Sequence, residues 1–128
     1  MPHTRIGTDL VEVPLIEESI KQFGTRYLTR IYTPEEIAYC EKGGAETTQR
    51  YAARFAAKEA CIKVLRPIDQ PIPWRDIEVK KMPGGWCELQ LHDTARDLAD
   101  AAGITHLSLS LSHERSTAIA VVAATLAP

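Results

Sequence analysis

The sequence is poor in the residues that mark several specialised classes of protein. Only three of its 128 residues are cysteine, and its N-terminal segment has no apolar run of the kind that a secretory signal needs. The cysteines show no C-x-x-C spacing, which argues against a disulfide framework. We therefore expect a cytoplasmic protein in which Cys40, Cys61 and Cys87 are small, buried side chains.

Neither a long hydrophobic segment nor an excess of one charge is present. The longest apolar stretch, residues 118–127, is far shorter than a membrane-spanning helix. The 15 Lys and Arg residues nearly balance the 17 Asp and Glu residues, giving a net charge of −2. These features argue against a membrane protein and against general binding of nucleic acid. No repeat or low-complexity tract divides the chain, so we expect one domain over residues 1–128.

What the sequence does contain is a series of short periodic segments separated by Pro and Gly. Thr33 to Glu36 form a capping box with Pro34 at the first helical position, so a helix begins there and ends near Gly43. Residues 49–65 give the strongest helix signal, because they are rich in Ala and lack Gly and Pro. Strands and helices mix without strict βαβ order, which predicts an α+β fold with a mainly antiparallel sheet. The other expected elements are strands at 5–13, 75–81, 86–91, 107–112 and 118–126, and helices at 14–23, 25–31 and 93–102.

Two carboxylates break the pattern of the elements that carry them. Asp9 shares a strand face with Gly7 and Val11, because side chains alternate along a strand. Glu59 lies on the apolar stripe of the helix at 49–65, one turn after Phe55. A buried carboxylate needs a basic partner, hydrogen bonds or a metal ion. An ordinary ion pair explains one such residue, whereas two in one small domain favour a shared site.

Basic residues surround Glu59 in the sequence. Lys63 follows it by one helical turn, which places an ammonium group beside the carboxylate. A basic helix face is often only solvated. Carboxylates together with Lys and Arg also suit phosphate chemistry through Mg²⁺, which binds one or two carboxylates plus phosphate and water oxygens. Residues 49–66 contain five basic residues, namely Arg50, Arg54, Lys58, Lys63 and Arg66.

Other candidate sites are weaker. The four histidines lack paired ligand spacing, which argues against zinc. Ser112 and His113 could join an acid in a hydrolase triad, but no G-x-S-x-G elbow is present. His113 otherwise reads as a packed, hydrogen-bonded histidine. Gly84 and Gly85 read as a hairpin turn, which would also admit a flat ring or a phosphate close to the backbone.

Three segments of the chain resemble the holo-acyl-carrier-protein synthase family of 4′-phosphopantetheinyl transferases. They are IGTDLVEV at 6–13, RFAAKEA at 54–60 and SLSH at 110–113. Their order and spacing match the family over nearly the whole chain. The resemblance implies transfer of 4′-phosphopantetheine from coenzyme A to a serine of an apo-acyl carrier protein. Adenosine 3′,5′-bisphosphate would be the other product.

The resemblance also implies roles for individual residues. Asp9 and Glu59 would bind Mg²⁺, and Lys63 would join them as a catalytic residue. The chemistry also needs a base for the serine proton, either a metal-bound water or a nearby carboxylate such as Glu59, and the sequence does not choose between them. The residues implied at the coenzyme A site are Arg54, Lys58, Lys63, Gly84, Gly85 and His113.

Two further implications concern partners. The helix around Arg26 and Arg30 matches the basic surface that receives the acidic helix of the carrier protein. Members of the family are typically homotrimers with active sites between protomers. His113 and the turn at 83–85 would then reach the site from the sheet.

The chain departs from the family pattern in three segments. Residues 14–16 (PLI) lack a basic residue that is usual there, and residues 43–48 (GGAETT) lack basic residues often found near coenzyme A. Residues 66–69 (RPID) replace a usual Gly-Thr-Gly. These changes leave both carboxylates in place. They also suggest an alternative, a non-catalytic subunit that binds coenzyme A or the carrier protein and has kept the fold.

Overall fold

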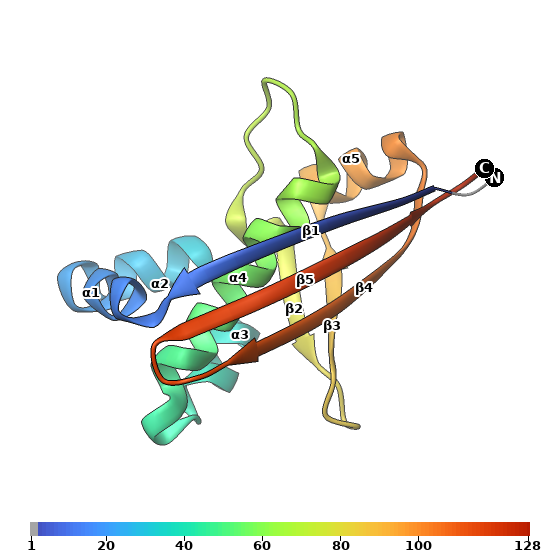
Figure 1. The fold of residues 1–128 in the computed structure, drawn as a ribbon. Helices are drawn as coiled ribbons and strands as arrows, with labels where there is room; N and C mark the ends of the chain where they lie inside the picture. The colour runs from blue at the N-terminus through green and yellow to red at the C-terminus, as the bar shows by residue number, and fades with distance from the viewer. Residues whose placement is uncertain (1–2) are drawn as a thin grey trace.

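The computed structural model describes residues 3–128 and is an α+β fold with two antiparallel sheets. The larger sheet has the strand order β1-β5-β4, and the smaller one is the hairpin β2-β3 (Figure 1). The strands are β1 (His3–Glu12), β2 (Ile77–Lys81), β3 (Cys87–Leu91), β4 (Ile104–His113) and β5 (Thr117–Leu126). The helices are α1 (Val13–Phe23), α2 (Thr25–Ile31), α3 (Pro34–Glu41), α4 (Thr47–Leu65) and α5 (Asp93–Ala102). Two short 3₁₀ turns, η1 (Gly44–Glu46) and η2 (Trp74–Asp76), complete the described elements.

Helix α4 crosses one face of the larger sheet and forms the centre of the core (Figure 1). Five of its alanines are fully buried, and such small side chains let the helix approach the strands closely. At Gly7 on β1 the strand backbone lies so near α4 that an added Cβ would overlap the carbonyl oxygen of Ala60. Glycine at this position therefore sets the distance between β1 and α4.

The predicted capping box is confirmed at the start of α3. The backbone N–H of Glu36 donates to Thr33 Oγ1 at 3.2 Å, and the backbone N–H of Thr33 donates to Glu36 Oε1 at 2.8 Å. Both residues are buried. The box therefore fixes a helix end inside the protein rather than on its surface.

All the predicted helices and strands are present; α2 and α5 have the expected ends, whereas the ends of the other elements differ from the expected ones. Strand β4 begins three residues before the predicted 107–112 segment, because its pairing with β5 continues to Ile104 opposite Leu126. Residues 75–76, predicted as strand, belong instead to η2. Cross-strand hydrogen bonding, which a local sequence pattern does not report, decides these ends.

The face of the larger sheet that lies away from α4 is exposed and carries an apolar patch on β1 and β5, while β4 presents serines there. Side chains alternate along each strand, so one set packs against α4 while the other points outward. Four large hydrophobic side chains of the outward set are exposed by 38–70%, namely Ile6, Leu10, Ile119 and Val121. Leu10 and Ile119 are direct cross-strand partners. These four residues are called the outer sheet face below.

The cysteines are free thiols, with Cys40 and Cys61 buried as predicted and Cys87 half-buried. Burial raises the pKa of both the Cys40 and the Cys61 thiol to about 12, so these two groups are neutral and unreactive near pH 7. Among residues 3–128, no helix is long and apolar enough to cross a membrane.

Candidate active site

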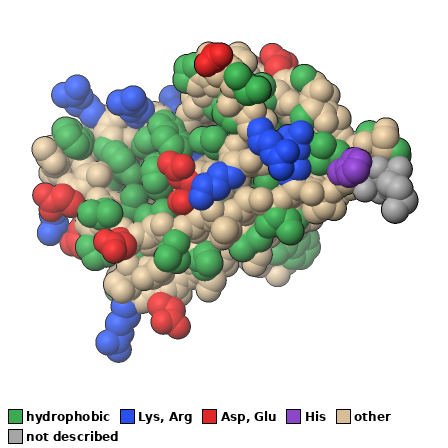
Figure 2. All heavy atoms as spheres, turned by 45° about the horizontal axis from the view of Figure 1, so that its top comes forward, with side chains coloured by type: hydrophobic (Ala, Val, Ile, Leu, Met, Phe, Trp, Pro, Cys, Tyr) green, Lys and Arg blue, Asp and Glu red, His purple; other side chains and the backbone are tan. Residues whose placement is uncertain are grey.

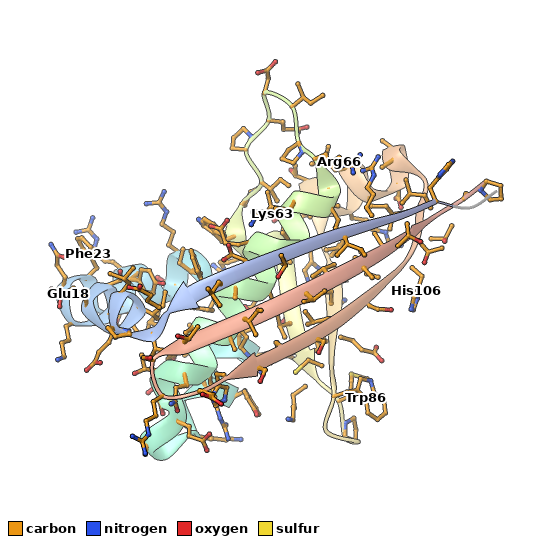
Figure 3. The ribbon with its side chains drawn as sticks, viewed as in Figure 1. Glu18, Phe23, Lys63, Arg66, Trp86 and His106 are labelled. Atoms are coloured by element: carbon orange, nitrogen blue, oxygen red, sulfur yellow. The ribbon has the colours of Figure 1, made fainter. Side chains whose placement is uncertain are left out.

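Asp9 lies on the α4-facing side of β1, between Gly7 and Val11, as the alternation of the strand predicts. Its side chain is 20% exposed. The ammonium group of Lys63 on α4 lies 3.4 Å from Asp9 Oδ1 and also donates to the backbone carbonyl of Thr8 at 2.6 Å. Figure 3 shows Lys63 on α4 beside β1. The ion pair therefore joins the sheet to the helix.

Glu59 is half-buried on α4, one turn before Lys63. Burial raises the pKa of its carboxyl, and the nearby charge of Asp9 raises it further, while Lys63 acts in the opposite direction. The sequence predicted that Lys63 would sit beside Glu59, but the ion pair that forms is with Asp9. The structure thus brings Asp9, Glu59 and Lys63 together from two elements.

The chemistry of this cluster suits a divalent cation. Its two carboxylates lie near one ammonium, and burial first, with the charge of Asp9 second, raises the pKa of Glu59. Within residues 3–128, no third His, Cys, Asp or Glu completes a metal-binding group with them. Mg²⁺ accepts such a site, because one or two carboxylates suffice when phosphate and water supply the other oxygens. On the face shown in Figure 2, acidic and basic side chains meet near the middle among apolar and uncharged neighbours.

Lys58, for which the family resemblance implied a place at the coenzyme A site, makes other contacts within the chain. Its side chain is fully buried and points about 100° around α4 from that of Glu59. The ammonium group donates to Glu36 Oε1 at 2.9 Å, to the carbonyl oxygen of Trp74 at 3.2 Å and to that of Ile77. An ammonium has three donors, so none is left for a phosphate. The positive charge counted on this helix is therefore partly neutralised inside the protein.

Arg54 is also buried, at 3% exposure, but it has no carboxylate partner among the ion pairs of the described residues. Its guanidinium lies 4.3 Å from the centre of the Tyr39 ring, and Nη2 is 3.9 Å from the Cys87 sulfur at the start of β3. Nε has no hydrogen-bond acceptor within residues 3–128. A buried cation that is only partly satisfied is consistent with the expected contact to an anion. No local sequence pattern indicates that Arg54 stacks on Tyr39.

Within one chain, the remaining predicted residues lie away from Asp9 and Glu59. His113 ends β4 beside Glu46, with 3.9 Å between its Nε2 and Glu46 Oε2. Because Glu46 precedes the first turn of α4, about 18 Å of helix separates that end from Glu59. Gly84 and Gly85 lie in the turn between β2 and β3, where the Trp86 ring covers Gly84 and Gly85 has a φ of 104°. Figure 3 shows Trp86 at the end of that hairpin, far from Lys63.

Arg26 and Arg30 are both exposed on α2, which follows α1 at the end of β1. Leu15 and Phe23 on α1 are exposed as well, by 62% and 51%. This end of the molecule therefore presents basic and apolar side chains together.

Comparison with known proteins gives a consistent result. Residues 5–122 match the 4′-phosphopantetheinyl transferase superfamily. The chain is 44% identical to a holo-acyl-carrier-protein synthase of Koribacter versatilis (strain Ellin345) over 117 residues, which is 91% of this chain and 93% of the relative. A relative of the same name from Dehalococcoides mccartyi (strain CBDB1) is 44% identical over 119 residues, 92% of this chain and 95% of that protein.

Solved structures agree with these relatives. The Helicobacter pylori holo-acyl-carrier-protein synthase in complex with coenzyme A superposes with a TM-score of 0.81 at 34% identity, covering 94% of this chain and 99% of that one. A Chronobacterium ammoniagenes complex with coenzyme A gives a TM-score of 0.86 at 28% identity, with 98% and 99% coverage. The match of sequence, fold and length shows that the chain belongs to the holo-acyl-carrier-protein synthase family of the 4′-phosphopantetheinyl transferase superfamily.

Proposed function

We propose that this chain is an Mg²⁺-dependent enzyme that transfers 4′-phosphopantetheine from coenzyme A to a serine of an apo-acyl carrier protein. The observation that carries the proposal is the cluster of Asp9, Glu59 and Lys63. Asp9 on β1 and Lys63 on α4 are 54 residues apart in the sequence and in contact in the fold. Relatives covering more than 90% of the chain carry the name of this activity.

The reaction is a displacement at phosphorus. The serine oxygen forms a bond to the phosphorus that carries pantetheine, and the bond from that phosphorus to the bridging oxygen breaks. The serine proton passes to a base, and adenosine 3′,5′-bisphosphate leaves with the bridging oxygen. Such a reaction needs little covalent chemistry from the protein, because positioning and charge stabilisation lower the barrier.

Each residue of the cluster has a distinct part in this proposal. Asp9 and Glu59 would hold Mg²⁺, which when bound offsets the negative charge of the pyrophosphate. Lys63 is 53% exposed, so its ammonium can meet a phosphate oxygen while it remains close to Asp9. Arg54 would supply a second positive charge towards the 3′,5′-bisphosphate.

The proposal is tested by incubating the full chain with coenzyme A, Mg²⁺ and several apo-carrier proteins. Mass spectrometry should show that a carrier gains phosphopantetheine, and Glu59→Gln should abolish the gain without unfolding the protein. The absence of a gain with every carrier, under conditions where a known synthase modifies them, would reject the transferase. Binding of coenzyme A by calorimetry without Mg²⁺ dependence or turnover would favour the alternative, a binding subunit with altered segments at 43–48 and 66–69.

We also propose that the enzyme assembles as a homotrimer. The outer sheet face exposes four large apolar side chains, and a patch of this kind on a folded domain is typical of a protein interface. Within one chain, His113 lies beside Glu46 rather than being paired with the cluster of Asp9, Glu59 and Lys63, and Trp86 next to the turn at 83–85 lies far from Lys63 (Figure 3). A neighbouring copy would bring them there. Arg26 and Arg30 on α2 would meet the acidic carrier protein.

A further inference from the structure

Glu36 and Lys58 form a fully buried ion pair away from the cluster of Asp9, Glu59 and Lys63. Their charged atoms lie 2.9 Å apart, and both side chains are 0% exposed. The Lys58 ammonium also donates to the carbonyl oxygens of Trp74 and Ile77, which belong to η2 and the start of β2. This single side chain therefore connects α4 to three other elements.

Glu36 completes the connection. Its Oε1 accepts from the backbone N–H of Thr33 and from Lys58, and its Oε2 accepts from the backbone N–H of Val79 at 2.8 Å. The carboxylate thus joins the start of α3, the middle of α4 and the strand β2. Hydrogen bonds to a buried charged group depend on direction. A shift of any of these elements would therefore break a short contact to Glu36 or Lys58.

The contacts of α4 with the larger sheet are of a different kind. Its polar contacts with that sheet, from Lys63 to Thr8 and Asp9 and from Arg5 Nη1 to the Val64 carbonyl oxygen at 2.9 Å, are made by side chains that are not fully buried. The buried part of the contact is made by small side chains such as Ala60, which lies against Gly7 of β1. Methyl groups pack without directional bonds, so this surface alone specifies the rotation of the helix poorly. Side chains reach about 5–6 Å from a helix axis, so a rotation of about 20° would move a carboxylate by about 2 Å. A binding site for a small cation does not tolerate such a displacement.

We propose that the Glu36–Lys58 pair is a positioning device that fixes the rotation of α4 and thereby holds Glu59 against Asp9. Lys58 and Glu59 are consecutive residues and point about 100° apart on the helix, so anchoring one side chain on its flank sets the direction of the other. Buried polar pairs are used in other helical proteins to fix one packing arrangement. The inference rests on the proposed function, because it assigns Glu59 to the metal site.

The test measures metal binding as well as turnover. Lys58→Met removes the anchor. Because that variant leaves a buried charge on Glu36, the double variant Glu36→Gln/Lys58→Met is made beside it, so that neither charge is left unpaired. Binding of Mn²⁺ to the full chain is followed by electron paramagnetic resonance, and transfer is assayed over a range of Mg²⁺ concentrations. We expect both variants to bind Mn²⁺ at least 10-fold more weakly and to need at least 10-fold more Mg²⁺.

A matched destabilised variant separates positioning from stability. Ala95→Gly/Ala99→Gly weakens the buried side of α5, which makes none of the contacts described for Lys58 and Glu36. At a temperature where all variants are folded, it should keep the wild-type Mn²⁺ affinity and turnover. Equal Mn²⁺ affinity and Mg²⁺ requirement in the wild type and in both anchor variants would overturn the positioning role.

The outcomes also distinguish this inference from the proposed function. A wild-type chain that binds Mn²⁺ but modifies no carrier would overturn the transferase alone, and the positioning role would then be judged on Mn²⁺ affinity. A wild-type chain that binds no Mn²⁺ would overturn the positioning role, because there would be no metal site for the pair to align.

Discussion

Lys63 on α4 lies 3.4 Å from Asp9 on β1, and no other ion pair among residues 3–128 joins this helix to the larger sheet. The lysine is 53% exposed and the aspartate 20% exposed, so the contact sits at the protein surface. Surface ion pairs contribute little to stability. The position of Lys63 is therefore better explained by what it offers to a bound anion than by what it adds to the fold.

Replacing Lys63 by Met should reduce transfer by about 100-fold, because one preorganised positive charge is lost where charge develops on the leaving phosphate. The melting temperature should change little, since the lost ion pair is exposed. Steady-state kinetics and calorimetry measure the two effects. Arg96→Gln, which removes the exposed Arg96–Asp100 pair on α5, is the control and should leave transfer unchanged. A Lys63 variant that loses stability but keeps its turnover would contradict the assignment.

Replacing Glu59 by Gln should stabilise the metal-free protein near neutral pH. The pKa of Glu59 is raised in the folded state, so folding favours its protonated form. Stability is therefore lost as the pH rises from the ordinary pKa of a glutamate through the raised one, and the loss is complete above it. We expect a higher melting temperature for Glu59→Gln than for the wild type near pH 7, and no difference near pH 4. Mg²⁺ should then stabilise only the wild type. Calorimetry at both pH values, with and without Mg²⁺, decides the matter.

Replacing Gly7 by Ala should destabilise the protein by about 3 kcal/mol, the upper part of the range for overpacked cores. The new Cβ would meet the backbone carbonyl of Ala60, which cannot move aside as a flexible side chain would. Transfer should also fall, because β1 carries Asp9 and α4 carries Glu59. Urea unfolding measures the loss, with Thr4→Ala at an exposed position of β1 as the control. If Gly7→Ala were as stable as the wild type, β1 and α4 would be able to move apart without loss of stability.

The sequence predicts most strongly those features that depend on neighbouring residues. The capping box at Thr33 and Glu36 is one example, since its partners are three positions apart. The alternation that turns Asp9 towards α4 is another, because it follows from the strand itself. Features of this kind need only local geometry, and the structure agrees with them.

Lys58 shows what local patterns cannot supply. Counting charges along 49–66 treats it as one more basic residue on a solvated helix. Its acceptors come from Glu36, Trp74 and Ile77, up to 22 residues away and on both sides of it in the sequence. Only the tertiary fold brings these groups together. The same holds for Arg54, whose burial depends on Tyr39 and Cys87.

Replacing Ile119 by Lys should dissociate the proposed trimer. Ile119 is 40% exposed on β5, so a lysine is tolerated in the isolated chain, whereas three buried ammonium groups in one interface would repel each other. Size-exclusion chromatography with light scattering should show a monomer, and transfer should be lost with the fold intact by circular dichroism. Glu114→Lys, at an exposed position of the β4–β5 turn, is the matched charge change and should remain a trimer. A wild-type chain that is itself monomeric would reject the assembly.

Complementation between two inactive variants tests whether one site uses residues of two copies. Lys63→Met damages the cluster beside Asp9, and His113→Ala damages the end of β4, which lies away from that cluster within one chain. If a site takes Lys63 from one copy and His113 from its neighbour, a mixed trimer contains some sites in which both residues are intact. Co-refolding the two variants should then restore a fraction of the wild-type transfer, whereas either variant refolded alone should stay inactive. Mixed trimers without recovered transfer would place both residues in sites built by a single copy.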